Sequence, residues 1–253
     1  MTSTTSDWLR QFRPAPDSEI RLVCFPYAGG AASYYFPLAK ALAPGIDVHA
    51  VQYPGRQDRY REPVIDDIHR LADAVLPVVA ELTDRPLALF GHSMGAVLAY
   101  EVALRLEERH GVKPLVLFAS GRRAPSRYRD EDDVHLRDDT ALLAEIRSLE
   151  GTSNAVLQDP ELLEMVLPAL RGDYRAIGTY RSVPGASVSC PVVGLIGVDD
   201  PKVSAEEARD WERHTRGGLD LLSYPGGHFF LTDRMTEVAE VIKDRLGALR
   251  GTA

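Results

Sequence analysis

The chain has 253 residues, of which 45% are hydrophobic and 26% charged, a composition typical of a globular protein with a full core. Its formal net charge of −8 argues against nonspecific nucleic-acid binding. Residues 1–7 contain no apolar run, and no stretch is long enough to span a bilayer. We therefore expect a cytoplasmic protein without a secretory signal or membrane partner. Cys24 and Cys190 are interpreted as buried apolar residues, not as a disulfide or metal site.

Short apolar segments alternate with helical patterns along most of the chain. This alternation predicts an α/β fold with a mostly parallel central sheet and helices on both faces, in a single domain over residues 1–253. The predicted strands are residues 21–25, 48–51, 86–90, 115–119, 191–197 and 219–224, and the predicted helices among them are residues 33–42, 65–82 and 96–106.

One motif in this pattern carries chemistry. Gly91-His92-Ser93-Met94-Gly95 fits Gly-x-Ser-x-Gly and stands between a predicted strand and a predicted helix. In that context the motif forms a sharp turn that exposes a serine hydroxyl at the start of the helix. Ser93 is therefore the predicted nucleophile, and the competing interpretation is a structural glycine turn.

The alternation of strands and helices stops between about residues 122 and 184. Helical patterns cover residues 140–149, 160–170 and 172–180, and no strand is predicted. This insertion is expected over the sheet edge that carries Ser93. We interpret it as a helical lid and not as a second domain.

A serine hydroxyl needs a base, and the base needs an orienting acid. Asp199 and Asp200 follow one predicted strand and His228 follows the next, in the order Ser, Asp, His that α/β-hydrolases use. The carboxyl ends of parallel strands share one edge, so these side chains are expected to converge. The choice of acid stays open between the two aspartates, with Asp200 favoured because it precedes Pro201.

Attack on a carbonyl creates an oxyanion that needs preorganised donors, usually two backbone N–H groups. One comes from the residue after the nucleophile, here Met94, and the other from the loop after an earlier strand. Residues 27–30 occupy that place, and Ala28 is the predicted donor. The competing interpretation is again a plain glycine turn.

The remaining histidines do not predict a metal site. His92 is expected to point away from the nucleophile, and His69, His110 and His214 are expected at the surface, in helices or at their ends. No pair has the spacing of metal ligands, so we predict no metal and no cofactor. The six are His49, His69, His92, His110, His135 and His214.

Five segments, in order, resemble the signatures of stand-alone type II thioesterases of polyketide and nonribosomal peptide pathways, an α/β-hydrolase family. The resemblance covers nearly the whole chain. It implies hydrolysis of acyl groups from the phosphopantetheine arm of acyl or peptidyl carrier proteins, through Ser93, Asp200 and His228, with Ala28 and Met94 as oxyanion donors and a flexible lid. The segments are Phe25-Pro26-Tyr27-Ala28-Gly29-Gly30, Val51-Gln52-Tyr53-Pro54-Gly55-Arg56, Phe90-Gly91-His92-Ser93-Met94-Gly95-Ala96, Ser120-Gly121-Arg122-Arg123-Ala124-Pro125 and Gly226-Gly227-His228-Phe229-Phe230.

Other functions stay open at this point. A general esterase or lipase and an acyltransferase would use the same three side chains, while a noncatalytic binding protein often lacks one of them. No feature supports a nucleic-acid partner, and we expect a monomer. Arginines after two predicted strands either form a basic rim for an acidic carrier protein or pair with carboxylates such as those of residues 130–133. These arginines are Arg56, Arg59, Arg61, Arg122, Arg123, Arg127 and Arg129.

Overall fold

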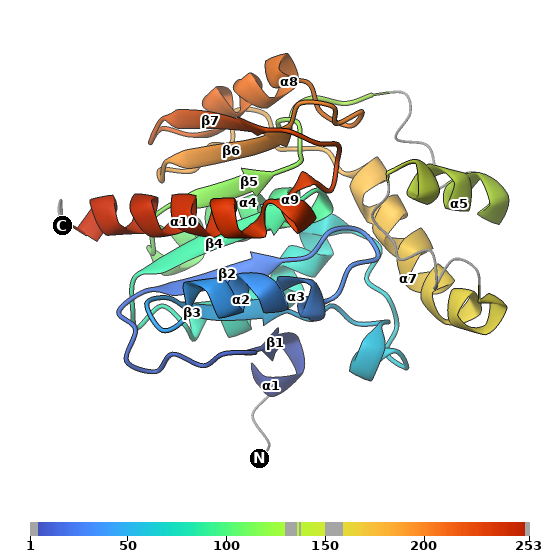
Figure 1. Ribbon diagram of the computed structural model, residues 1–253, viewed down its shortest axis with the longest axis horizontal. Helices are drawn as coiled ribbons and strands as arrows, with labels where there is room; N and C mark the ends of the chain where they lie inside the picture. Colours follow the sequence, from blue (N-terminus) through green and yellow to red (C-terminus); the bar gives the residue numbers. More distant parts are fainter. Residues whose placement is uncertain (1–4, 130–135, 137, 150–158, 251–253) are drawn as a thin grey trace.

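A computed structural model of the chain describes residues 5–129, 136, 138–149 and 159–250 (Figure 1). Its centre is a seven-stranded sheet in the order β1-β3-β2-β4-β5-β6-β7, in which only β1 runs antiparallel to its neighbour. The predicted α/β-hydrolase architecture, with a mostly parallel sheet between helices, is confirmed. The strands are β1 (Leu9–Arg10), β2 (Arg21–Phe25), β3 (Asp47–Val51), β4 (Leu87–His92), β5 (Leu117–Ser120), β6 (Val192–Gly197) and β7 (Leu219–Tyr224).

Helices lie on both faces of the sheet, because the strands are apolar on both faces. In β2, Leu22 and Cys24 pack with α2 and α10, while Val23 and Phe25 pack with α3 and α4 on the opposite face. The α-helices are α1 (Thr5–Trp8), α2 (Phe36–Leu42), α3 (Ile68–Ala80), α4 (Met94–His110), α5 (Asp139–Ser148), α7 (Pro160–Thr179), α8 (Ala205–Arg209), α9 (Phe230–Asp233) and α10 (Met235–Arg250); short 3-10 helices span Ala32–Tyr35, Gln57–Arg59 and Asp210–His214.

The segment between β5 and β6 leaves the sheet. Its helices α5 and α7 lie beside the carboxyl ends of the strands (Figure 1). No strand occurs in the described part of residues 122–184. The two helical patterns predicted for residues 160–170 and 172–180 form one continuous helix, α7, so the predicted break between them is wrong. Gly172 stays helical because it packs on Val64, where a Cβ atom would lie 2.3 Å from Val64 Cγ1.

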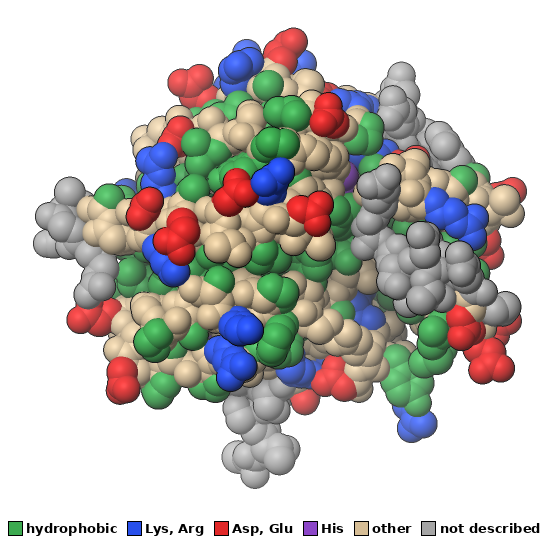
Figure 2. All heavy atoms as spheres, in the orientation of Figure 1, with side chains coloured by type: hydrophobic (Ala, Val, Ile, Leu, Met, Phe, Trp, Pro, Cys, Tyr) green, Lys and Arg blue, Asp and Glu red, His purple; other side chains and the backbone are tan. Residues whose placement is uncertain are grey.

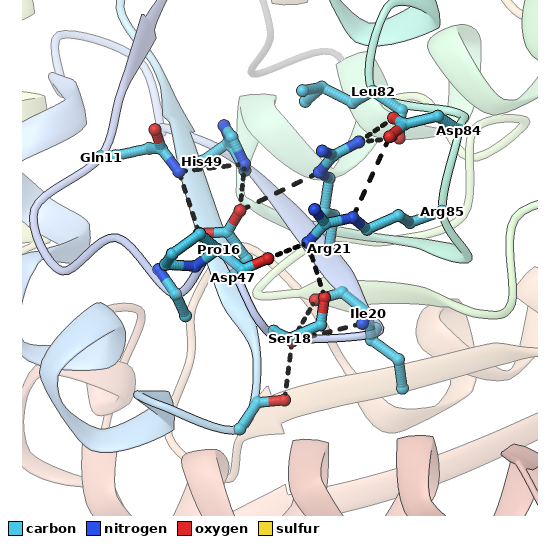
Figure 3. Close-up of polar contacts among 12 residues, drawn as sticks. Gln11, Pro16, Ser18, Ile20, Arg21, Asp47, His49, Leu82, Asp84 and Arg85 are labelled. Carbon is cyan, nitrogen blue, oxygen red and sulfur yellow. Dashed lines mark hydrogen bonds and ion pairs between the residues drawn. The ribbon is translucent and has the colours of Figure 1, made fainter.

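The amino ends of β2 and β3 are held by a polar cluster far from that edge. Figure 3 shows Gln11, Arg21 and His49 converging on the carboxylate of Asp47. Gln11 Nε2 donates to Asp47 Oδ1 at 2.9 Å, and His49 Nε2 lies 3.0 Å from Oδ2. Asp47 is only 4% exposed, so these contacts compensate the burial of its charge. The cluster fastens the segment after β1 to the sheet.

The surface mixes charges of both signs. Lys, Arg, Asp and Glu side chains are interspersed over the face drawn in Figure 2. Both cysteines, Cys24 and Cys190, are buried and unpaired with each other, as expected from the sequence. None of the described helices combines the length and the apolar character needed to cross a membrane.

Candidate active site

Ser93 occupies a strained turn between β4 and α4. Its backbone has φ +54° and ψ −117°, a region that non-glycine residues rarely adopt. The two motif glycines make this turn fit sterically. A Cβ atom on Gly91 would lie 2.1 Å from the Gly95 carbonyl oxygen, and one on Gly95 would lie 2.0 Å from the Phe25 carbonyl oxygen. The Gly-x-Ser-x-Gly pattern is therefore required by backbone packing around the serine.

The structure brings Ser93, His228 and Asp200 into one hydrogen-bonded chain. His228 Nε2 lies 2.9 Å from Ser93 Oγ, and His228 Nδ1 lies 2.8 and 3.0 Å from the two carboxylate oxygens of Asp200. A carboxylate only accepts hydrogen bonds, so Nδ1 carries the proton and Nε2 of the neutral ring is left to accept from the serine. This is the arrangement that activates a serine hydroxyl.

The structure also distinguishes the two candidate acids. Asp200 is buried and its side chain contacts His228, whereas Asp199 is exposed. A second donor, the backbone N–H of Lys202, reaches Asp200 Oδ1 at 2.8 Å and fixes the carboxylate. The side chain that orients His228 is therefore that of Asp200.

Two backbone N–H groups beside Ser93 are available to an oxyanion. Those of Ala28 and Met94 have no hydrogen-bond acceptor among the described residues, whereas the N–H of Ser93 donates to the Ser120 carbonyl oxygen at 2.8 Å. Ala28 also lies beside Ser93 in the wall of the same cavity, together with Met94. The structure thus places both predicted donors next to the nucleophile.

Two small adjoining cavities open at Ser93. They measure about 30 and 50 Å³, and both are lined by Ala28, Ser93, His228, Leu149 and Tyr174. Tyr174 belongs to α7, and Leu149 directly follows α5. An ion pair between Glu145 of α5 and Lys202 ties this helix to the loop that carries Asp200. The helices between β5 and β6 therefore cover the site.

His92 lies next to His228 and takes no part in the hydrogen bonds among Ser93, His228 and Asp200. It is fully buried, its Nδ1 lies 2.9 Å from Ser120 Oγ, and its ring centroid lies 5.2 Å from that of His228. Burial and the neighbouring His228 lower the pKa of His92 well below its usual value, so its ring is neutral.

The prediction that His214 lies on the surface is wrong. It is 5% exposed, and its ring packs against Tyr100 and Trp211. His214 Nε2 lies 2.8 Å from Ser126 Oγ, and its Nδ1 contacts the Tyr100 hydroxyl. The end of this short helix therefore faces the interior, where two hydroxyls contact the ring nitrogens of His214. His135 lies outside the described residues. Among the residues described, no group of three or more His, Cys, Asp or Glu is arranged to hold a metal ion.

Several arginines considered for a basic rim are paired within the protein. Buried Arg56 forms an ion pair with Asp173 of α7. Outside the core, Arg127 pairs with Asp210 and Arg129 with Glu207, and the latter pairing lowers the pKa of Glu207 to about 2. These ion pairs favour pairing within the protein over a basic rim. Asp173 is a carboxylate of the insertion, as that interpretation expected, whereas Asp210 and Glu207 follow β6. The carboxylates of residues 130–133 lie outside the described residues.

Comparison with known proteins agrees with this geometry. The family model described as "Thioesterase domain" matches residues 20–246. The chain belongs to the thioesterase family. This thioesterase is 50% identical to thioesterase PikA5 of Streptomyces venezuelae over 96% of its own length and 87% of the relative's. It is 33% identical to the gramicidin S biosynthesis protein GrsT of Aneurinibacillus migulanus, over 96% and 95% of the two chains.

The solved structures agree as well. The type II thioesterase BorB from the borrelidin biosynthetic cluster superposes with a TM-score of 0.89 at 48% identity, over 97% of this thioesterase and 99% of that chain. Similarity therefore extends over nearly the whole chain.

Sequence reasoning missed Asp173, a buried carboxylate of this thioesterase close to the site. It contacts the predicted oxyanion loop and Arg56. A signal was present, because Leu170, Asp173 and Ile177 share one face of a helix at i, i+3 and i+7, and a lone carboxylate among apolar residues requires a partner.

Proposed function

We propose that this thioesterase hydrolyses acyl thioesters held on the phosphopantetheine arm of acyl or peptidyl carrier proteins, as an editing type II enzyme of polyketide or nonribosomal peptide biosynthesis. The observation that carries the proposal is the hydrogen-bonded series of side chains from Asp200 through His228 to Ser93. It ends at a cavity beside two backbone N–H groups that have no acceptor among the described residues. Support comes from solved structures named as type II thioesterases, BorB of the borrelidin biosynthetic cluster and YbtT of the yersiniabactin NRPS/PKS biosynthetic pathway.

The first half of the reaction transfers the acyl group to Ser93. The Oγ atom attacks the thioester carbonyl while His228 Nε2 takes the hydroxyl proton, and Asp200 stabilises the resulting imidazolium. The N–H groups of Ala28 and Met94 donate to the oxyanion. The carbon–sulfur bond then breaks, and His228 gives its proton to the departing phosphopantetheine sulfur.

The second half releases the acid. A water molecule gives a proton to His228 Nε2 as its oxygen attacks the acyl-Ser93 carbonyl, and the same two N–H groups bind the second oxyanion. The bond to Ser93 Oγ breaks, and this oxygen recovers the proton from His228. The products are a free carboxylic acid and a carrier protein with a free thiol.

The proposal includes the organisation of the chain. Residues 1–253 form one domain, and the segment of about residues 122–184 is a lid that opens to admit the phosphopantetheine arm. Asp200, His228 and Ser93 supply the chemistry without a cofactor, since phosphopantetheine belongs to the substrate. The protein acts as a cytoplasmic monomer with carrier proteins as its partners.

The test is intact-protein mass spectrometry of an acyl-loaded carrier protein incubated with wild type or with Ser93→Ala. Loss of the acyl mass with wild type only, leaving free phosphopantetheine on the carrier, is the expected result. An unchanged acyl-carrier across short and medium acyl groups, together with cleavage of a simple oxoester, would instead indicate an esterase. Transfer of the acyl group to an added alcohol or amine in preference to water would indicate an acyltransferase.

A further inference from the structure

One buried carboxylate, that of Asp173 on α7, joins the helical insertion to the loop beside the nucleophile. Asp173 is 0% exposed, and its Oδ2 atom accepts from the Gly29 N–H at 2.7 Å. Its two oxygens also accept from Arg56 Nη1 at 2.6 Å and Nη2 at 2.9 Å. The carboxylate is therefore held by three donors, of which one belongs to the loop that contains Ala28.

The geometry of that loop depends on the peptide that Asp173 binds. The Gly30 N–H donates to the Tyr27 carbonyl oxygen at 2.9 Å, so residues 27–30 form a β-turn. Gly29, its third residue, has φ +77°, as a type II turn requires. The central peptide of a type II turn is flipped relative to that of a type I turn, and the hydrogen bond from Gly29 to Asp173 fixes this orientation.

Close packing makes the contact rigid. A Cβ atom on Gly29 would lie 2.2 Å from Leu170 Cδ2, so α7 rests directly on the turn. Arg56 is a second link between α7 and the turn, because it binds Asp173 and its Nη1 also donates to the Gly30 carbonyl oxygen at 3.2 Å. The ion pair holds the turn from one side, while the cavity beside Ser93 lies along Ala28.

A purely stabilising role does not explain this arrangement well. A buried ion pair loses most of its Coulombic gain to desolvation, so apolar residues of similar size often stabilise a core as much. Burial opposes the charge on Arg56, but Asp173 outweighs that effect and raises the pKa of Arg56. What the pair provides beyond stability is a fixed acceptor for a backbone N–H one residue from the predicted oxyanion donor.

We propose that Asp173 is a positioning residue for the oxyanion hole: its carboxylate, held by Arg56, orients the turn of residues 27–30 so that the Ala28 N–H faces the substrate carbonyl. The inference rests on the proposed function, because it takes Ala28 as an oxyanion donor. It also implies that the site is complete only while α7 is seated on the turn.

The decisive comparison uses two double variants in the Arg56→Gln background. Asp173→Asn keeps an oxygen acceptor for the Gly29 N–H, whereas Asp173→Ala removes it, and neither leaves an uncompensated buried charge. Removal of one oxyanion donor costs about 10²–10³ in kcat. For a misplaced donor we expect the alanine variant to have a kcat about 10-fold below the asparagine variant, with KM values within about 2-fold. Affinity for a trifluoromethyl ketone, which forms an oxyanion on Ser93, should fall by the same factor as kcat.

Glu101→Gln is the matched control. It disturbs another buried carboxylate, one that binds Arg105 and the Tyr180 hydroxyl, about two turns of α4 from Ser93. The Glu101→Gln variant should be less stable than wild type, while its kcat stays within about 2-fold of the wild-type value. Equal kcat values for the two double variants, or an unchanged ketone affinity, would overturn the proposal for Asp173. Hydrolysis that survives in Ser93→Ala would instead overturn the proposed function itself.

Discussion

The strained backbone at Ser93 predicts that glycine is more stable than alanine at the position of the nucleophile. Both Ser93→Gly and Ser93→Ala remove the hydroxyl and its contact with His228. Only glycine adopts φ +54° and ψ −117° without steric penalty, and such a conformation costs other residues about 1–3 kcal/mol. Glycine loses about 0.5–1 kcal/mol through the greater entropy of the unfolded chain. Ser93→Gly should therefore exceed Ser93→Ala in free energy of unfolding by about 1 kcal/mol.

Equilibrium unfolding in urea at 25 °C, followed by the fluorescence of the buried Trp211, measures this difference. Gly247 of α10 is the control position, because it is exposed and a Cβ atom there would contact nothing within 4 Å. In that helix Gly247→Ala should raise stability by about 0.5–1 kcal/mol. The order of glycine and alanine should thus be opposite at the two positions. Alanine above glycine at both would refute the strain at Ser93.

Three further predictions concern the turn that carries Ser93, the acid that orients His228, and the dependence of stability on pH. Gly95→Ala should lower the free energy of unfolding by about 2 kcal/mol or more, because its Cβ atom would lie 2.0 Å from the Phe25 carbonyl oxygen; an unchanged urea midpoint would contradict this. Asp200→Asn should lower kcat about 10⁴-fold by disturbing the tautomer of His228, while Asp199→Asn stays within about 2-fold, and steady-state kinetics showing the reverse would reassign the acid. Burial lowers the pKa of three histidines, so these side chains bind a proton less readily in the folded protein than in the unfolded chain. The free energy of unfolding should therefore fall as the pH drops below about 6.5, by up to about 1.4 kcal/mol per pH unit for each histidine. Urea unfolding at pH 7.5 and 5.5 tests this, and equal stability at the two pH values would contradict it. These histidines are His49, His92 and His214.

The sheet was predictable because its signals are local. Most of the six parallel strands are short, mainly apolar segments bounded by turn residues, so their place in the chain and the edge at which they end follow from the sequence. The contacts among Ser93, His228 and one aspartate follow from that shared edge. The two-residue strand β1 is too short to show a pattern, and it forms because Leu9 pairs with Val51.

The rest depends on contacts between distant parts of the chain. Asp199 and Asp200 are neighbours in one turn, and only the turn's backbone decides which carboxylate faces His228. Asp173 and Arg56 are separated by 117 residues, so no local pattern pairs them. Gly172 suggests a helix end by composition, but packing on the body of the protein keeps it helical.

Detection of an acyl group on Ser93 tests the proposed mechanism most directly. Wild type mixed with acyl-loaded carrier protein is quenched within milliseconds, and the enzyme is analysed by intact-protein mass spectrometry and peptide mapping. We expect a transient species in which the acyl group replaces one hydrogen on the peptide that contains Ser93, and no such species in Ser93→Ala. Full turnover without any acylated enzyme, or with the acyl group on another residue, would contradict it.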